Sequence, residues 1–231
     1  MNRFLVRDKG FGKYNLFVPG WATGTEIFEN VKPGHDHIYV QDFDPFTFTK
    51  DGADFLAVNG IKKISLTGFS MGAAAVLHSL DVIGTEVENV ELVGLRKSYS
   101  RETIDNVRLN LTKNKEAFLY RFYSDMFSPS ESAALAAFKA GLMKKYTGSF
   151  SVPYLLSGLD YLQHTTSGFC MGNGTRVKFI YGSADRILSA EEVDKYRKEA
   201  DNIEGANSTV SFDFIEGGGH APFIKDPGIL K

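Results

Sequence analysis

Short apolar runs alternate with amphipathic segments along most of the chain. Apolar runs bounded by Gly, Pro, Asn or Asp predict strands at 14–18, 37–40, 64–67, 87–95, 177–181 and 210–215. Helical spacing predicts helices at 52–59 and 189–200, and Ser189 and Glu192 form a capping-box pattern at the start of the second. Strands that alternate with helices predict an α/β fold, with a mostly parallel sheet covered by helices on both faces.

The alternation stops after Leu95, where a helical pattern continues to about residue 162. Asn173-Gly174 marks the end of this region. We therefore expect one core formed by residues 1–95 and 173–231. Residues 96–172 are expected to form a helical cap, inserted before the strand that leads to Asp185.

The composition is that of a folded protein and narrows the classes of partner. The chain has 231 residues, 43% of them hydrophobic, and a formal net charge of −2, which speaks against general nucleic-acid binding. No apolar run is long enough for a signal peptide or a membrane span, so we expect a cytoplasmic monomer without membrane contact. The single cysteine, Cys170, is expected to be an incidental thiol.

The most informative motif is Gly68-Phe69-Ser70-Met71-Gly72, which follows an apolar run and precedes an alanine-rich helical segment. A serine at the apex of a tight strand-to-helix turn is typical of a nucleophile elbow, in which strained dihedrals expose the hydroxyl. The flanking glycines have no Cβ to clash where strand and helix nearly touch. The alternative is a serine in an ordinary turn, and the flanking strand and helix favour the elbow.

A serine hydroxyl needs a base to take its proton and a third group to orient that base. His220, after the last predicted strand and three glycines, is the candidate base, and Asp185, which also follows a strand, is the candidate acid. The order Ser70, Asp185, His220 is that of α/β-hydrolases. Asp213 and Asp160 are alternative acids, although the first lies inside a strand and the second inside the insertion.

The oxyanion that forms when serine attacks a carbonyl needs backbone N–H donors. Met71, directly after the candidate nucleophile, offers one donor at the positive end of its helix. Pro19-Gly20-Trp21 follows the strand at 14–18 and brings the Trp21 amide to the position of the second donor. The Trp21 indole is either part of an acyl pocket or a packing residue.

Neither a metal ion nor another cofactor is expected. His35 and His37 lie two residues apart, but no further Cys or His cluster completes a coordination sphere, so we assign them to a turn and a strand start. The glycine-rich segments near Gly172 and Gly217 lack the residues of a phosphate-binding loop.

The chain resembles the α/β-hydrolase superfamily over nearly its whole length. The motifs that carry the resemblance occur in the family's order and are Phe17-Val18-Pro19-Gly20-Trp21, Gly68-Phe69-Ser70-Met71-Gly72, Gly182-Ser183-Ala184-Asp185 and Gly218-Gly219-His220-Ala221-Pro222-Phe223. More narrowly, the Gly-Trp pair, the elbow and the compact cap are similar to the pimeloyl-acyl-carrier-protein methyl ester esterases of biotin synthesis. Two features depart from the family pattern: Pro19 replaces a common histidine, and Phe4-Leu5-Val6 supplies at most one N-terminal strand.

The resemblance implies a serine carboxylesterase in which Ser70 is the nucleophile, His220 the base, Asp185 the acid, and the Trp21 and Met71 amides the oxyanion donors. Several aromatic residues of the core and cap are substrate-binding candidates, and they either enclose an acyl chain or attach the cap to the core. These candidates are Trp21, Phe69, Phe118, Phe122 and Tyr123.

The cap region is basic, whereas the rest of the chain is acidic. From Arg96 to Thr165 there are ten Lys or Arg and six Asp or Glu, a net charge of +4. Such a surface attracts an acidic partner, and the alternative is an ordinary solvated helical surface. In the resembled family an acidic acyl-carrier protein docks on a basic cap, which makes the candidate docking residues Arg108, Arg121, Lys139, Lys144 and Lys145.

The specific prediction is therefore demethylation of a pimeloyl-acyl-carrier-protein methyl ester. One alternative is a broad-specificity esterase or thioesterase that acts on a small free substrate. Another is a binding protein that has a hydrolase fold but no catalytic activity, since fold alone does not establish function.

Overall fold

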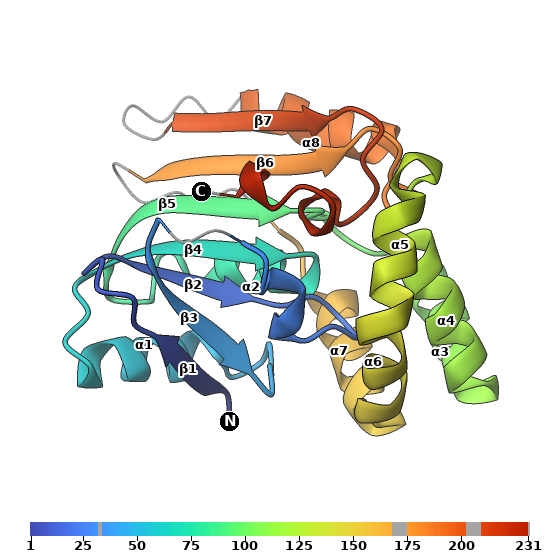
Figure 1. Ribbon diagram of the computed structural model, residues 1–231, viewed down its shortest axis with the longest axis horizontal. Helices are drawn as coiled ribbons and strands as arrows, with labels where there is room; N and C mark the ends of the chain where they lie inside the picture. The colour runs from blue at the N-terminus through green and yellow to red at the C-terminus, as the bar shows by residue number, and fades with distance from the viewer. Residues whose placement is uncertain (32–33, 168–174, 202–208, 231) are drawn as a thin grey trace.

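The computed structural model describes residues 1–31, 34–167, 175–201 and 209–230. In these ranges, seven strands form one sheet in the order β1-β3-β2-β4-β5-β6-β7 (Figure 1). The strands are β1 (Arg3–Arg7), β2 (Tyr14–Val18), β3 (Asp36–Gln41), β4 (Lys63–Phe69), β5 (Glu86–Val93), β6 (Arg176–Gly182) and β7 (Thr209–Ile215). Strand β1 is antiparallel to β3, and the other neighbours are parallel, which confirms the predicted mostly parallel sheet.

Apolar and polar residues alternate along the central strands, and the register aligns them across the sheet. Ile38, Leu16, Leu66, Val90 and Val177 are successive register partners on five neighbouring strands, and all are buried. This continuous apolar row forms part of the core, because side chains in register on parallel strands lie on one face.

The intervening positions form a polar row on the opposite face. Asn89 Nδ2 donates to Ser65 Oγ at 3.2 Å, and Arg176 Nε donates to Asn89 Oδ1 at 2.8 Å. The row borders a cavity of about 520 Å³ near the amino ends of the strands. Hydrogen bonds between the side chains satisfy their polar groups, so this part of the sheet does not require an apolar cover.

Helical segments lie on both faces of the sheet, with the α-helices of the core on one face and short 3-10 turns on the other. In Figure 1, α1 (Phe48–Val58), α2 (Met71–Ser79) and α8 (Ala190–Asp201) lie behind the sheet, whereas the short turns η1 (Thr25–Phe28), η4 (Pro222–Ile224) and η5 (Pro227–Ile229) lie in front. The predicted capping box of α8 forms, because the Ser189 N–H donates to Glu192 Oε2 at 3.0 Å and the Glu192 N–H donates to Ser189 Oγ at 3.3 Å.

The helices between β5 and β6 gather at the carboxyl ends of the strands (Figure 1). They are α3 (Arg101–Lys113), α4 (Lys115–Asp125), η2 (Pro129–Glu131), α5 (Ser132–Phe138), the π-helix η3 (Lys139–Met143), α6 (Lys144–Ser149) and α7 (Val152–His164). We refer to this group of helices as the cap. Cys170 and the expected cap boundary at 172 and 173 lie outside the described residues. None of the described helices has the length and apolar character that crossing a bilayer requires.

Candidate active site

Ser70 occupies the turn between β4 and α2, with φ at 53° and ψ at −113°. This conformation is strained for a residue with a side chain, and packing on both sides maintains it. A Cβ at Gly68 would lie 2.6 Å from Ala73 Cα, and a Cβ at Gly72 would lie 2.4 Å from the Pro19 carbonyl oxygen. Glycine is therefore required at both positions for the strand and helix to approach this closely.

His220 and Asp185 form a buried pair. His220 Nδ1 lies 2.7 Å from Asp185 Oδ2, and both side chains are almost completely buried. Asp185 Oδ1 accepts hydrogen bonds from the N–H groups of Ile187 and Leu188 at 2.7 and 3.0 Å. Burial raises the pKa of Asp185, but His220 and these backbone hydrogen bonds outweigh burial, so the pKa is lowered overall. The ionised carboxylate is thus suited to hold a proton on Nδ1.

The alternative acids have other partners. Asp213 on β7 lies 3.1 Å from the Lys178 ammonium, and Asp160 on α7 pairs with a cap arginine. Among these three aspartates, Asp185 is the one that hydrogen-bonds His220. The loops that carry the two residues follow β6 and β7, whose ends are paired in the sheet, and this pairing brings them together.

The His220 imidazole lies beside the ends of β4 and β5. The Ser70 N–H donates to the Val93 carbonyl at 2.8 Å, and a Cβ at the next residue, Gly94, would lie 2.7 Å from His220 Cε1. Among the described residues, His220 Nε2 has no hydrogen-bond partner, so the Ser70 hydroxyl does not bind it in this conformation. Catalytic hydrogen bonds are often long without substrate and shorten when substrate binds.

Ser70 and Tyr99 border the same narrow pocket. Burial raises the pKa of Tyr99, and the opposing effects of Arg96 and of Ser70 are smaller. The Arg96 guanidinium lies 4.8 Å from the centre of the Tyr99 ring and 2.6 Å from Glu192 Oε1. Ser70, Arg96 and Tyr99 border this narrow pocket, which has no room for a water molecule.

The candidate oxyanion donors lie on neighbouring segments. Met71 is the first residue of α2, so its N–H has no acceptor within the helix. Trp21 follows β2, and both residues line the same large cavity. The Trp21 indole N–H donates to the Leu155 carbonyl at 2.8 Å, and a Cβ at Gly158 would lie 2.6 Å from Trp21 Cδ1. Close packing against α7 therefore holds the indole in place.

The other aromatic candidates for substrate binding lie around Trp21 and the imidazole. Phe118 and Phe122 pack edge-on against Trp21, with ring centroids 6.3 and 5.2 Å away. Phe69 is buried, with its ring centroid 5.3 Å from that of the imidazole. Tyr123 is fully buried and donates its hydroxyl to the carbonyl of the residue after Trp21 at 2.6 Å, so it supports this loop. Of the five aromatic candidates, Trp21 lines the large cavity.

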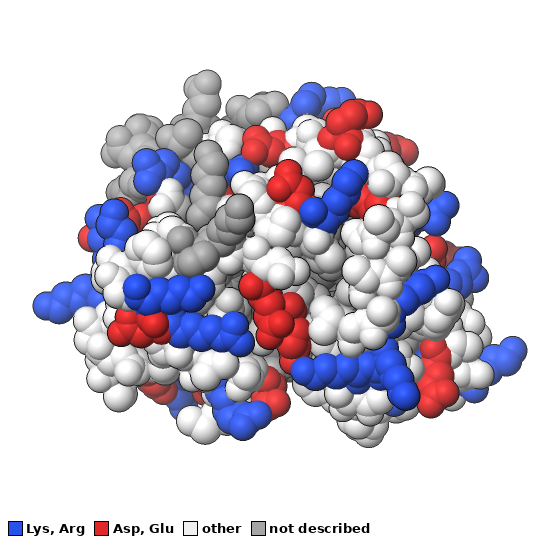
Figure 2. Space-filling model, in the orientation of Figure 1, with Lys and Arg blue, Asp and Glu red and all other residues white. Residues whose placement is uncertain are grey.

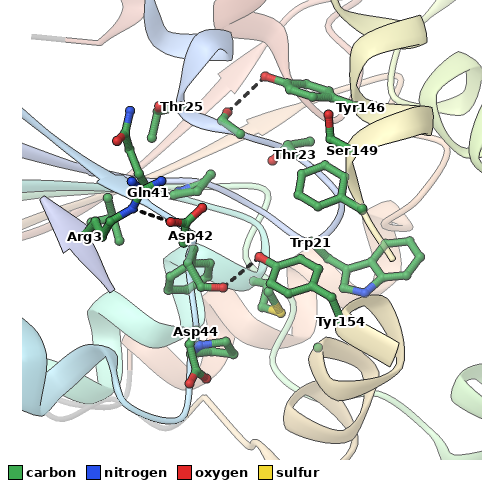
Figure 3. Close-up of a pocket in the computed structure, with 18 of the residues that line it drawn as sticks. Arg3, Trp21, Thr23, Thr25, Gln41, Asp42, Asp44, Tyr146, Ser149 and Tyr154 are labelled. Atoms are coloured by element: carbon green, nitrogen blue, oxygen red, sulfur yellow. Dashed lines mark hydrogen bonds and ion pairs between the residues drawn. The ribbon is translucent and has the colours of Figure 1, made fainter. Parts of the chain in front are cut away.

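This cavity has a volume of about 740 Å³ and lies between the loops after β2 and β3 on one side and α6 and α7 on the other (Figure 3). Its wall combines aromatic rings with hydroxyl groups. Tyr146 donates to the Gly24 carbonyl at 3.2 Å, and Tyr154 donates to the Phe43 carbonyl at 2.7 Å (Figure 3). Burial raises the pKa of Tyr154 to about 12, so its hydroxyl stays neutral. Ser70 is not part of this lining.

Two ion pairs lie at the rim of the cavity. Arg3 contacts Asp42, and Lys145 contacts Glu26. Burial raises the pKa of Glu26, but hydrogen bonds from Lys145 and Tyr146 outweigh burial, so the pKa is lowered. These two ion pairs neutralise four of the charged groups that line the cavity.

The cap cations proposed to dock a partner differ in how far they are neutralised. They are Arg108, Arg121, Lys139, Lys144 and Lys145. Arg108, Arg121 and Lys145 pair with carboxylates of this chain. Lys139 lies over an aromatic ring of α4, and neither Lys139 nor Lys144 has a carboxylate partner within the described residues. On the face shown in Figure 2, basic and acidic side chains lie beside one another, including on the cap.

The described residues contain no group of three His, Cys, Asp or Glu arranged to hold a metal ion. His37 is a buried core residue, with Nδ1 2.8 Å from the Tyr39 hydroxyl. Burial lowers its pKa to about 4, so it is neutral at physiological pH. His35 borders the polar cavity on the sheet face.

Four residues that the sequence analysis did not single out belong to this region. Gly94 lies near the end of the strand predicted at 87–95, and Arg96 and Tyr99 follow that strand. The loops that follow parallel strands meet at the same edge of a sheet, which is a usable signal. Glu131 contacts the His220 loop from the cap. The Ser128–Glu131 capping-box spacing identifies a helix start, but nothing local indicates that longer contact.

A scan against models of protein families finds no match, and neither does a search of curated proteins. Solved structures match over almost the entire chain. A bromoperoxidase from Bacillus anthracis has a TM-score of 0.78 and 20% sequence identity, covering 96% of this chain and 89% of its own. An esterase from Exiguobacterium antarcticum has a TM-score of 0.75 and 16% identity, and the match covers 97% of this chain and 91% of the esterase. MGS-M2, an α/β hydrolase from a Medee basin deep-sea metagenome library, has a TM-score of 0.75 and 12% identity, and the match covers 99% of this chain and 90% of MGS-M2. The chain therefore has the α/β-hydrolase fold.

Proposed function

We propose that this chain is a serine carboxylesterase. The Ser70 oxygen attacks the ester carbonyl while His220 Nε2 takes its proton, and the Trp21 and Met71 N–H groups bind the resulting oxyanion. His220 then gives the proton to the leaving alcohol, and the acyl group remains on Ser70. Water attacks this acyl-enzyme with His220 as base, which releases the acid and restores the serine. Asp185 orients the imidazole and stabilises its charged form throughout.

One observation carries the proposal: a buried His–Asp pair at 2.7 Å lies against Gly94, next to a serine held at positive φ. A strained serine backbone costs about 1–3 kcal/mol, and a buried ionised carboxylate is costly as well. A strained backbone and a buried charge that occur together at one edge of a sheet are typical of catalytic sites. The α/β-hydrolase fold and the esterase among the similar structures support the same reading.

The test compares turnover of p-nitrophenyl acetate by the wild type, Ser70→Ala and Ser98→Ala. Ser98 is an exposed serine in the loop after β5, which makes it a matched control. We expect Ser70→Ala to lower kcat by at least about 10³-fold with an unchanged melting temperature, and Ser98→Ala to keep full activity. Turnover that persists in Ser70→Ala would contradict the mechanism. A wild type that binds esters without hydrolysing them would favour the non-catalytic alternative.

We further propose a pimeloyl-acyl-carrier-protein methyl ester as the physiological substrate, and a cytoplasmic location. The motif resemblance and the +4 charge of the cap region support this choice. So do Lys139 and Lys144, two of the candidate docking residues, for which the described part of the chain provides no carboxylate partner. The ion pairs of the other three cap cations favour the broad-specificity alternative. Complementation of a strain that requires biotin because it lacks its own esterase, scored against Ser70→Ala, tests the pathway.

Salt dependence distinguishes a carrier-bound substrate from a small one. Docking of an acidic carrier protein on cap cations is screened by salt, so hydrolysis of the carrier-bound ester should fall sharply as salt is added. Turnover of a small neutral ester should barely change. Equal salt responses for the two substrates would favour the broad-specificity esterase or thioesterase.

A further inference from the structure

The loop that carries His220 is hydrogen-bonded to the core on one side and to the cap on the other. On the core side, the Gly217 N–H donates to Ser183 Oγ at 2.8 Å. On the cap side, the His220 N–H donates to the Met126 carbonyl at 2.8 Å. The cap therefore contacts the backbone of the candidate base itself, in addition to covering the substrate region.

Glu131 is the side chain at the centre of this contact. Its Oε2 accepts a hydrogen bond from the Ser128 N–H, in its own helical turn, and another from the Gly219 N–H in the His220 loop, both at 2.8 Å. The residue is only 2% exposed, and within the described residues no Lys, Arg or His lies at ion-pair distance. A buried carboxylate without a cation is costly unless N–H groups compensate its charge. Here one N–H group from the cap and one from the core do so.

The cap and the loop that carries His220 are packed closely against each other. Ser128 Oγ and Ser130 Oγ both donate to the Gly217 carbonyl, the latter at 2.7 Å. A Cβ at Gly219 would lie 2.4 Å from the Met126 carbonyl oxygen and 2.7 Å from Glu131 Oε2. The cap and the His220 loop are therefore in direct contact, and even a methyl group would separate them.

We propose that Glu131 is a positioning residue that fixes the backbone next to His220, so that the geometry of the catalytic base depends on the cap. The inference rests on the proposed function, because it assigns the base to His220. Closing the turn at Ser128 requires only the first hydrogen bond, whereas the bond to Gly219 spans the interface. Without it a buried N–H loses its acceptor, and the residue preceding the base loses one of the hydrogen bonds that fix its position.

The test compares Glu131→Gln, Glu131→Asp and Glu131→Ala with Glu116→Ala, which removes an exposed glutamate of the same cap. Gln keeps an acceptor oxygen at the same reach, so we expect kcat for p-nitrophenyl acetate within about threefold of the wild type. Asp keeps the charge, but its side chain is one methylene too short to reach the Gly219 N–H, so we expect kcat to fall about 10- to 100-fold. Ala removes the acceptor, so we expect a larger fall in kcat. KM should stay within about twofold throughout, because the small ester does not bind at Glu131.

Amide hydrogen exchange in the peptide containing residues 216–221 reports the same contact without any catalysis. We expect faster exchange in the Asp and Ala variants, and wild-type exchange in Glu131→Gln and Glu116→Ala. Wild-type kcat and exchange in Glu131→Asp would overturn the proposal, and so would a Gln variant that is as impaired as Ala or fails to fold. If Glu131→Ala does not fold, the comparison of Glu131→Gln with Glu131→Asp decides whether the proposal holds. A wild type without esterase activity would refute the proposed function, while the exchange data would still test the contact.

Discussion

Replacing Gly94 with alanine would place a methyl group against the His220 imidazole. Gly94 has φ at 61°, and a Cβ on its backbone would lie 2.7 Å from Cε1 and 3.0 Å from Nδ1 of the ring. Ordinary contacts begin at 3.4 Å, so the ring or the strand end must move by at least about 0.7 Å. Because Nδ1 is bound to Asp185, this movement also strains the hydrogen bond that orients the base.

Gly84 provides a control for the backbone effect. Its φ is 68°, and a Cβ there would meet nothing within 4 Å. Alanine at positive φ costs about 1–2 kcal/mol of stability at either position, because the Cβ crowds the carbonyl oxygen. Only Gly94→Ala also displaces the imidazole. A misplacement of about 1 Å can cost 10²-fold in rate, so we expect kcat to fall about 10²-fold in Gly94→Ala and less than twofold in Gly84→Ala.

The assay measures kcat and KM for p-nitrophenyl acetate, together with urea unfolding of both variants and the wild type. Gly94→Ala should lose about 1–3 kcal/mol more unfolding free energy than Gly84→Ala, because its Cβ also clashes with a buried ring. Its kcat should in addition be about 10²-fold lower than that of Gly84→Ala, although both variants are folded in the assay. If Gly94→Ala and Gly84→Ala were equally active, the imidazole beside Gly94 would have no part in the rate-limiting chemistry, and the mechanism would lose its base.

Three further substitutions test other parts of the structure. Tyr99→Phe removes a hydroxyl from the wall of the narrow pocket that Ser70 borders, and we expect a two- to fivefold faster reaction with a fluorophosphonate, because the wall beside the serine becomes less crowded. The folded pKa of His37 is about 4 against 6.5 for the free side chain, so its contribution to stability is complete above about pH 6.5 and is lost as pH falls toward 4. Between about pH 7 and pH 5, we expect the unfolding free energy measured in urea to fall by about 2 kcal/mol less for His37→Gln than for the wild type. Gly158→Ala would force a Cβ to within 2.6 Å of Trp21 Cδ1, and we expect it to lower the unfolding free energy by about 1–3 kcal/mol although alanine favours helix.

Each of these expectations has an outcome that would contradict it. Slower labelling of the Phe variant would mean that the Tyr99 hydroxyl assists the serine. Parallel pH curves for His37→Gln and the wild type would exclude His37 as the titrating group. Gly148 is a matched control for Gly158, because a Cβ there meets nothing within 4 Å, so Gly148→Ala should be neutral or stabilising. Equal effects at the two glycines would rule out close packing on the indole.

The strand pattern could be predicted closely, because it depends on neighbouring residues. Strand β2 has the predicted bounds, with Pro19-Gly20 marking its end. The predicted helix at 52–59 begins earlier, at Phe48, because the three polar residues that follow Phe48 hide the start of the helix from the apolar pattern. Strand β5 ends at Val93, two residues before the predicted limit, because the chain turns at positive φ at Gly94.

The site was predictable only in part. The motif order placed Asp185 and His220 after strands, and the structure pairs them at 2.7 Å. For Tyr123 the sequence left substrate binding and attachment of the cap both open. The structure places it buried beneath the Trp21 loop, where its hydroxyl donates to a carbonyl. Tyr99 beside the serine followed from no motif, since its role depends on where the loop after β5 turns.

By itself, the sequence determines the succession of strands and helices, and which chemical groups follow the ends of the strands. These features depend on apolar periodicity, glycines and capping residues within a few positions of each other. The tertiary structure decides which of these groups meet. The hydrogen bond from Gly219 to Glu131 joins residues 88 positions apart, and only the packing of the cap on the strand ends brings them together. No local pattern encodes such a contact, because its free energy arises from surfaces that exist only in the folded chain.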